Sequence, residues 1–395
     1  MPFFELVKEL PPDPIFGLNQ AFAADPRGLK VNLGAGVYKT DALESFVFHT
    51  VKKAESYLLD HETTKDYLSI DGLQEYVELT KVLVFGSGVP FDQIYGAQSV
   101  GGTAALRICS DFLYHHGYDS IYISEPTWMN HRRIFSDSGL KIQTYAYYDA
   151  QHHQFDFKGF CGALKQMAKK SIVLLQGCCH NPTGFDPSYA QWEEILILMK
   201  QYDLFPFFDF AYQGFGISLE KDAEVIRLFT KSGIQIAVAV SHSKNFGLYG
   251  ERTGALYFVC QDQQEMKKIG SQIKSVIRGL YSNPPCHGAK IVSLILKDQD
   301  LKRDWLKELA GIRDRISKMR HMLVNLLQRK THHFDFLAHQ LGMFAYTSLT
   351  VQEVEKLMSE YGIYLPKDGR INVAGLNEKN IDYVVDALNH VTINR

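Results

Sequence analysis

The sequence lacks the features of membrane proteins, exported proteins and nucleic-acid-binding proteins. None of its apolar stretches approaches the roughly 20 residues that span a bilayer, and charges interrupt residues 1–10, where a signal peptide would be apolar. The formal net charge is -2, and no run of basic residues stands out. We therefore expect a cytoplasmic protein that binds neither membranes nor nucleic acid.

Metal-binding and disulfide patterns are also missing. The six cysteines show no CxxC spacing, and Cys178 and Cys179 are adjacent, an awkward geometry for a disulfide. Several cysteines lie in apolar runs, which favours small buried side chains in a reducing compartment. The 15 histidines include adjacent pairs but no HExxH motif, so we expect them mainly in solvated loops. The sequence predicts no metal site.

The middle of the chain alternates short apolar segments with amphipathic ones. A length of 395 residues allows two domains, and 46% of the residues are hydrophobic. Short apolar strands separated by helices, such as those expected over 188–201 and 222–231, predict an α/β fold with a mostly parallel sheet covered by helices. Such a sheet binds ligands at the carboxyl ends of its strands. The expected strands are Ile121–Ser124, Ile142–Tyr147, Ser171–Gln176, Leu204–Phe210, Ile236–Val240 and Ala255–Val259.

The two ends of the chain predict a smaller α/β domain and an arm. A long helix expected over 302–328 keeps an apolar period of three and four, and would bridge two domains. After it we expect a helix near 351–361, a short strand around 370–373 and a terminal helix near 378–391. Prolines in the first 14 residues exclude a regular helix there and favour an extended arm. The expected division is an arm over 1–14, a small domain of 15–47 with 312–395, and a large domain over 48–311.

Lys244 is the most informative single residue. It follows the apolar strand expected over 236–240, and lysine is costly to desolvate, so a lysine at this place suggests an amine that is kept reactive. Ser241 and Arg252 supply a hydroxyl and a planar cationic fork, a pair suited to a phosphate ester. An amine that can form an imine beside a phosphate site suggests pyridoxal 5′-phosphate. A surface lysine in a glycine-rich loop is the plain alternative.

Polar residues at other strand ends fit the same cofactor. Asp209 stands among aromatic residues and needs a cationic partner, which a protonated pyridine nitrogen would supply. The alternative partner is a structural arginine. Asn181, in an Asn-Pro-Thr-Gly turn sequence, and Tyr212 could both donate to the phenolic oxygen of the cofactor, although a plain turn explains Asn181 equally well.

Glycines and arginines add a phosphate site and a carboxylate site. Gly102 and Thr103 open a helix whose amino end could bind phosphate, as could any helix start of this composition. Trp128 could stack on a ring or lie in the core. Arg278 and Arg370 could be surface charges. If both face the site, two bidentate forks would select a dicarboxylic amino acid.

Together these motifs resemble the class I aminotransferases of PLP fold type I, and most closely the aspartate aminotransferases. The likeness runs over nearly the whole chain, and seven motifs in the right order are specific where one would not be. The matching segments are Asn32–Tyr38, Glu62–Tyr67, Gly101–Arg107, Cys178–Gly184, Asp209–Phe215, Ser243–Tyr249 and Tyr281–Pro285.

The resemblance implies roles for individual residues. Lys244 would carry pyridoxal phosphate and then act as general base and acid, while Asp209, Asn181 and Tyr212 would contact the ring. The phosphate would be held by Gly102, Thr103, Ser241 and Arg252, with Tyr67 reaching it from the other subunit. Arg370 and the backbone near Gly36 would bind the substrate α-carboxylate. Trp128 would stack on the cofactor and touch the distal carboxylate, which Arg278 of the partner would bind. The family forms obligate homodimers with shared active sites and an arm that crosses to the partner.

The family reaction is a ping-pong transamination of L-aspartate and 2-oxoglutarate to oxaloacetate and L-glutamate. The aromatic-amino-acid branch of the same class, or dual specificity, stays open. Val37, Lys39, Thr103 and Asn283 look more like the aspartate branch, but Ser45 and Asp66 do not settle the choice. Another reaction of the cofactor, such as β-elimination or decarboxylation, and a non-catalytic regulator on the same fold are the remaining alternatives.

Three residues depart from the family pattern. Gln176 stands where relatives often carry histidine, His242 where an apolar residue is usual, and Thr253 where an aliphatic one is usual. These changes would alter the pKa of the cofactor or the pH range without removing a role. The resemblance also implies cis peptide bonds at Glu125-Pro126 and Asn181-Pro182.

Overall fold

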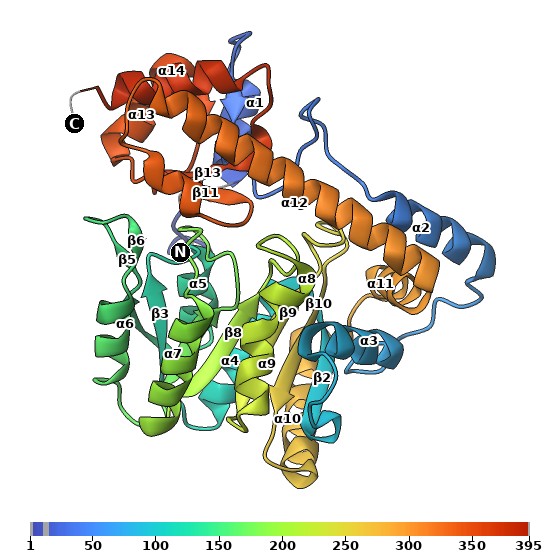
Figure 1. Cartoon of the computed structure of the whole chain (residues 1–395). Coiled ribbons are helices and arrows are strands. Elements are labelled where there is room, and N and C mark those ends of the chain that lie inside the picture. Colours follow the sequence, from blue (N-terminus) through green and yellow to red (C-terminus); the bar gives the residue numbers. More distant parts are fainter. Residues whose placement is uncertain (1–2, 11–15, 394–395) are drawn as a thin grey trace.

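A seven-stranded sheet forms the centre of the molecule (Figure 1). The computed structural model describes residues 3–10 and 16–393. The strand order is β2-β10-β9-β8-β7-β3-β4, and β10 alone runs against the others, so the predicted mostly parallel sheet is confirmed. The strands are β2 (Ile94–Val100), β3 (Ser120–Glu125), β4 (Lys141–Ala146), β7 (Ile172–Gln176), β8 (Phe205–Phe210), β9 (Ile236–Ser241) and β10 (Thr253–Val259).

Helices cover both faces of this sheet, so every residue of the central strands β7 and β9 is buried. Side chains alternate between faces along a strand, so Ile172 and Leu174 of β7 enter one core while Val173 and Leu175 enter the other. In Figure 1, α7 and α9 lie in front of the sheet and α4 lies behind it. The first core contains α4 (Gly101–His115), α5 (Asn130–Asp137) and α10 (Gln263–Leu280); the second contains α3 (Gln74–Phe85), α6 (Phe157–Leu164), α7 (Tyr189–Gln201), α9 (Glu224–Lys231) and α11 (His287–Lys297).

Strand β2 is absent from the expected set of strands. Its sequence, Ile-Tyr-Gly-Ala-Gln-Ser-Val, carries small and polar residues that hide the apolar pattern. Gly96 is needed here because a Cβ atom would lie 2.5 Å from the ring of Tyr257 on β10. Gln98 is buried and uses its side chain to bond the backbone of Leu73 and Pro285. These residues form a strand because they pair with β10. Such pairing depends on tertiary structure, so the local sequence does not reveal it.

A smaller group of elements packs above the sheet in Figure 1 and forms the small α/β domain. The helix expected over 351–361 is confirmed, and the terminal helix begins at Ile381 rather than near Glu378. The long helix α12 (Gln299–Gln328) joins this domain to the sheet. It passes residue 312 without a break, so the boundary placed there stays a prediction. The elements are α1 (Phe16–Ala24), β1 (Val31–Asn32), β11 (Phe344–Tyr346), α13 (Val351–Tyr361), β12 (Ile363–Tyr364), β13 (Arg370–Asn372) and α14 (Ile381–Val391).

Short elements complete the fold. Strand β1 pairs with β12 in parallel and β11 pairs with β13 in antiparallel fashion, so residues more than 300 positions apart share a sheet. The remaining helices and strands are α2 (His49–His61), β5 (Tyr148–Asp149), β6 (Gln154–Phe155) and α8 (Leu219–Asp222), with single 3₁₀ turns at Phe91–Gln93, Asp335–His339 and Val373–Gly375.

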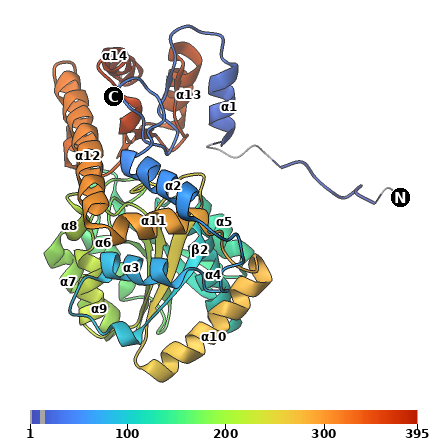
Figure 2. The same cartoon turned by 90° about the vertical axis from the view of Figure 1, so that its right-hand side faces the viewer.

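Residues 3–10 form an exposed, apolar segment. Figure 2 shows it away from the other elements. Phe3 is 95% exposed and Leu6 is 93% exposed, and large apolar side chains on a free surface mark a contact with another molecule. Residues 1–2 and 11–14 of the expected arm lie outside the described residues.

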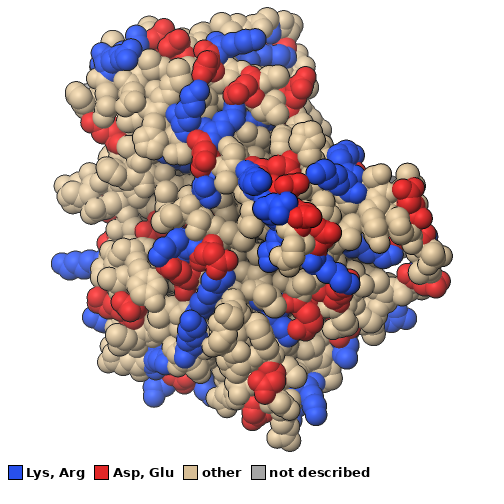
Figure 3. Space-filling view, turned by 45° about the vertical axis from the view of Figure 1, so that its right-hand side comes forward, with Lys and Arg blue, Asp and Glu red and all other residues tan. Residues whose placement is uncertain are grey.

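The outer surface carries charges of both signs. Lysine and arginine side chains lie among aspartate and glutamate side chains over the face shown in Figure 3. Within residues 3–10 and 16–393, every helix is too short or too polar to cross a bilayer.

Trp305 ties α12 to the turn that follows β9. Its indole Nε1 donates a hydrogen bond of 2.7 Å to the carbonyl oxygen of Asn245, and its ring stacks on Phe246 with the centroids 4.3 Å apart. The side chain is fully buried. Since Lys244 precedes these two residues, the bridging helix fixes the place of the lysine.

We expect Trp305→Phe to destabilise the fold by about 1–3 kcal/mol, because it removes this hydrogen bond and leaves a small void. The substitution should also lower the affinity for a ligand that binds at Lys244. Trp192→Phe in α7 is the matched control, because Trp192 is buried against Phe208 and Phe229. Thermal unfolding should show a loss for both variants and a loss of ligand affinity for Trp305→Phe alone. Equal affinity in both variants would refute the link.

Candidate active site

A cavity of about 1100 Å³ opens at the carboxyl ends of β7, β8 and β9, between the sheet and the small domain. All the predicted site residues line it except Tyr67 and Arg278. The lining residues predicted from the sequence are Gly36, Gly102, Thr103, Trp128, Asn181, Asp209, Tyr212, Ser241, Lys244, Arg252 and Arg370. Residues far apart in the chain therefore meet at the edge of the sheet where ligands are expected.

Lys244 brings a desolvated amine into this cavity. Its Nζ lies 4.8 Å from the centroid of the Tyr212 ring. Burial lowers the pKa of Lys244 to about 8, while the nearby Asp209 carboxylate raises it and Arg252 and Arg370 lower it further. Among the described residues, no carboxylate lies within ion-pair distance of Nζ. The lowered pKa leaves a larger fraction of this amine neutral near physiological pH than in an ordinary lysine, and the neutral amine can act as nucleophile or base.

A buried histidine orients Asp209 at the end of β8. His131 Nε2 lies 3.0 Å from Oδ2 of Asp209, and its Nδ1 lies 2.8 Å from the hydroxyl of Thr127. An ionised carboxylate only accepts hydrogen bonds, so Nε2–H donates to Asp209 and Nδ1 accepts from Thr127. Both Asp209 and His131 are buried. This chain fixes one carboxylate oxygen of Asp209.

Asn181 joins the sheet to the small domain. Its Nδ2 donates to the Tyr212 hydroxyl at 3.3 Å, and its Oδ1 accepts from Nη1 of Arg370 at 3.0 Å. Burial raises the pKa of Tyr212, against the opposing effect of Arg370. The three side chains thus form one row across the cavity, with a neutral phenol at one end and a guanidinium at the other.

Arg370 is a buried cation that forms no ion pair with the carboxylates of residues 3–10 and 16–393, although Asp368 lies near enough to raise its pKa. Its guanidinium lies 4.1 Å above the Phe344 ring and donates to the carbonyl oxygen of Gly34 at 3.2 Å. Among the described residues, its Nε has no hydrogen-bond partner. Burial lowers the pKa of Arg370. Because an unpaired buried charge is costly, this guanidinium is suited to receive a carboxylate from outside the protein.

The loop that follows β1 lines the cavity on the side of the small domain. Asn372 Nδ2 donates to the carbonyl oxygens of Ala35 and Val37, at 2.6 and 2.8 Å. Tyr249 Oη accepts from the backbone N–H of Tyr38 at 3.1 Å. These bonds hold Gly36 between them, with its backbone at the cavity.

An anion site is built where α4 begins. Gly101 has φ +70°, and a Cβ there would lie 2.5 Å from Nη2 of Arg252. A Cβ on Gly102 would meet the Cβ of Ser241 at 3.0 Å. Arg252 itself bonds the Ser243 hydroxyl at 3.3 Å. Glycine at both positions therefore brings the amino end of a 15-residue helix against a hydroxyl and a guanidinium, which suits a phosphate group.

Tyr67 and Arg278 lie outside this cavity in the single chain. Tyr67 is 93% exposed. Arg278 lies in the last turn of α10 and donates to the hydroxyl of Ser282. Their expected roles require a second subunit, so these roles stay predictions.

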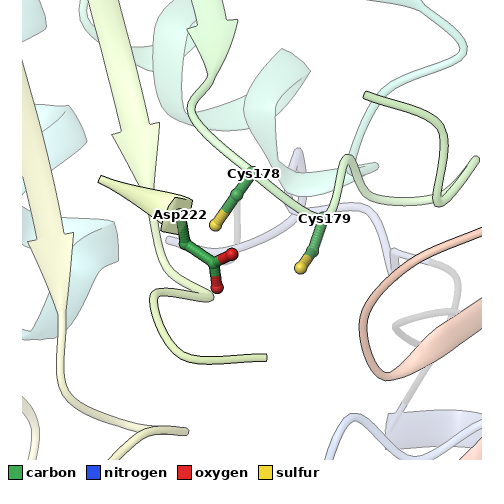
Figure 4. A group of neighbouring side chains, drawn as sticks. All are labelled: Cys178, Cys179 and Asp222. Carbon is green, nitrogen blue, oxygen red and sulfur yellow. The ribbon is translucent and has the colours of Figure 1, made fainter. Parts of the chain in front are cut away.

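One group of three possible metal ligands occurs among the described residues: Cys178, Cys179 and Asp222 (Figure 4). The carboxylate of Asp222 already accepts hydrogen bonds from the backbone of Gly214, Gly216 and Ile217. Burial raises the pKa of both thiols. Asp222 therefore stabilises the turn after β8, and the expected lack of a metal stays a prediction.

The structure corrects the expectation for histidines and adds site residues. His131, His180 and His242 are buried rather than solvated. His131 was missed because nothing in its sequence context shows that it reaches Asp209; its place four residues after a threonine is the only local signal. Tyr249 and Phe344 also line the cavity without having been predicted. The cis bonds expected at Glu125-Pro126 and Asn181-Pro182 are confirmed.

Comparison with known proteins identifies the family of this chain. The model of the aminotransferase class I and II family matches residues 29–388. The chain belongs to this family. It is 44% identical to the aspartate aminotransferase of Escherichia coli over 98% of this chain and 99% of that one, and 41% identical to the mitochondrial aspartate aminotransferase of Xenopus tropicalis over 97% and 91%.

Solved structures of aminotransferases share the whole fold. An aromatic-amino-acid aminotransferase from Burkholderia pseudomallei, covalently bound to pyridoxal phosphate, superposes with a TM-score of 0.96 at 42% identity and covers 99% of this chain and 100% of its own. A broad-specificity aminotransferase from Leishmania mexicana also reaches 0.96, at 35% identity over 99% and 98%. The fold is therefore that of the PLP fold type I aminotransferases, as the sequence predicted.

We expect Lys244→Met to stabilise the cofactor-free aminotransferase at pH 7, by on the order of 3 kcal/mol, because it removes a buried charge. Unfolded, the amine keeps its ordinary pKa of 10.5, while burial lowers the folded value to about 8. Between these values the unfolded chain binds more protons, so the wild type gains stability as pH rises. The advantage of the variant should shrink over this range in urea unfolding. A variant less stable than the wild type at pH 7 would contradict the desolvated amine.

Proposed function

We propose that this chain is a pyridoxal-phosphate-dependent aminotransferase that converts L-aspartate and 2-oxoglutarate to oxaloacetate and L-glutamate by a ping-pong mechanism. The observation that carries the proposal is the meeting of a desolvated lysine, a buried arginine and an anion site in one cavity. Relatives named aspartate aminotransferase over nearly the whole chain support the substrate.

The residues of the cavity fit pyridoxal phosphate. The amino end of α4 with Gly102, Thr103, Ser241 and Arg252 would hold the phosphate, because the missing Cβ atoms of Gly101 and Gly102 let the helix approach Arg252 and Ser241 closely. Asp209, fixed by His131, would pair with the pyridine nitrogen. Asn181 and Tyr212 would contact the phenolic oxygen, and Trp128 would cover the ring. When bound, the cofactor supplies an electron sink for the negative charge on the substrate α-carbon.

Lys244 would hold the cofactor and then move a proton. A general base works best when its pKa is near the operating pH, and burial brings the pKa of Lys244 to about 8. The amine would take the proton from the substrate α-carbon and then, as the ammonium ion, give it to the cofactor, which is the 1,3-proton shift that transamination needs. Tyr212, whose ring lies under Nζ, limits where the amine can go.

Substrate selection would rest on two arginines. Arg370, whose Nε lacks a partner among the described residues, would bind the α-carboxylate together with the backbone at Gly36. Arg278 of the partner subunit would bind the distal carboxylate. A planar guanidinium matches a carboxylate through two parallel hydrogen bonds, so two of them favour aspartate and glutamate over monocarboxylic amino acids.

We propose a homodimer with shared active sites, acting in the cytoplasm. The exposed apolar segment of residues 3–10 suits an arm that packs on a partner. Tyr67 is exposed and Arg278 lies outside the cavity of its own chain, as residues that serve the partner's site would be. All six cysteines are free thiols, which suits a reducing compartment.

Aromatic amino acids are the second candidate substrates. Structures named aromatic-amino-acid aminotransferase superpose with TM-scores of 0.94 to 0.96. Aspartate and aromatic substrates share the α-carboxylate contact, so the difference depends on the distal carboxylate.

The rates of turnover of aspartate and of tyrosine, each with 2-oxoglutarate, distinguish a preference for aspartate from a preference for aromatic amino acids. A charge-assisted hydrogen bond contributes about 1.5–3 kcal/mol, so we expect kcat/KM to be about 10- to 100-fold higher for aspartate. Arg278→Ala should remove most of this preference and leave turnover of tyrosine less affected. Equal kcat/KM values in the wild type would establish dual specificity and overturn the preference for aspartate.

Hybrid dimers test the shared site. Lys244→Ala and Arg278→Ala homodimers should each be impaired. If they are mixed, unfolded and refolded, a hybrid dimer places both defects in one site and leaves the other intact. Random reassortment should then restore about a quarter of wild-type activity with aspartate. A mixture that stays as inactive as its components would show that each chain builds its own site.

A further inference from the structure

Gln176 holds the main chain of Asn181 from both sides. Oε1 of Gln176 accepts the backbone N–H of Asn181 at 2.8 Å, and Nε2 donates to the carbonyl oxygen of Asn181 at 3.0 Å. Gln176 is the last residue of β7 and is buried. The oxygen and the nitrogen of the Gln176 amide thus both bond to Asn181. Because the backbone N–H needs an acceptor and the C=O needs a donor, only one orientation of the Gln176 amide satisfies both.

A residue pinned in this way has little freedom at its side chain. The Asn181 amide donates to the Tyr212 hydroxyl and accepts from Arg370. Its two contacts lie on different domains, since Tyr212 follows β8 and Arg370 begins β13. Rotating or shifting the main chain of Asn181 would break both contacts together.

We propose that Gln176 is a positioning residue: it holds the Asn181 amide where it donates toward the phenolic oxygen of the cofactor and braces Arg370 against the α-carboxylate. This inference rests on the proposed function. Gln176 lies beside Asp209 in the sheet, since the two residues are partners in the pairing of β7 with β8. The same strand end therefore supports the groups that would meet the ring and the carboxylate.

The chemistry of the side chain makes glutamine suited to this task. A carboxylate at this position could accept from the N–H of Asn181 but could not donate to its carbonyl oxygen. A thioether could do neither well. Glutamine also adds no titrating charge between Asp209 and Arg370, so the support is the same at every pH.

The test measures the pH titration of the visible absorption of the bound cofactor in the holoenzyme. A donor to the phenolic oxygen stabilises its anionic form and lowers the pKa of the chromophore. We expect Gln176→Met to raise that pKa by about 0.5–1 pH unit, the equivalent of one weakened hydrogen bond. KM for aspartate should rise several-fold as Arg370 loses its brace. Gln176→Glu, which keeps the length of the side chain, should shift the pKa in the same direction and serves if the methionine variant does not fold.

A matched control is available in the small domain. Gln340 is equally buried, and its amide pairs in the same way with one residue, accepting from Tyr346 N at 2.8 Å and donating to Tyr346 O at 3.0 Å. Gln340→Met should lower the melting temperature about as much as Gln176→Met. It should leave the pKa of the chromophore where it is in the wild type.

A double variant assigns the shift to Asn181. Asn181→Ala alone should raise the pKa of the chromophore, and adding Gln176→Met should raise it no further, because the supported amide is already gone. Additive shifts would overturn the positioning role. A folded Gln176→Met enzyme with an unchanged titration would overturn it as well, while the proposed function would stand. A wild-type protein that loads no cofactor would overturn both.

Discussion

The placement of two cations in one desolvated cavity is the constraint on which the site depends. Lys244 and Arg370 both lose water there, and burial lowers the pKa of each. Asp209 is the acidic group that raises the pKa of Lys244. A charge in such a place is costly, so the cavity suits ligands that arrive with negative charge, while the lowered pKa leaves part of the Lys244 amine neutral. A phosphate ester and a carboxylate are such ligands.

The rest of the structure keeps these cations in place. Trp305 of α12 fixes the turn around Lys244, and Asn181 ties Arg370 to the end of the sheet. His131 fixes Asp209 from α5. Each support is a hydrogen bond that a buried side chain makes to a residue of the site or to a residue next to it in the chain. Rigid supports of this kind preserve the geometry of the site.

Most of the fold and the site could be predicted from the sequence. The strands β7, β8 and β9 are short apolar runs, and residues just after them had to meet at one edge of a parallel sheet. Strand β2 was missed because Gly96, Gln98 and Ser99 break its apolar pattern. The contact of His131 with Asp209 and the bonds of the Gln176 side chain to the backbone of Asn181 were missed because only tertiary packing creates them. The roles of Tyr67 and Arg278 depend on a second subunit.

The central claim is that the amine of Lys244 holds the cofactor. Borohydride reduction of the protein incubated with pyridoxal phosphate, followed by digestion and mass spectrometry, tests it directly. The account predicts one reduced adduct, located on Lys244, formed fastest above pH 8, where this amine is mostly neutral. An adduct on another lysine, or none under conditions where the protein is folded, would contradict it.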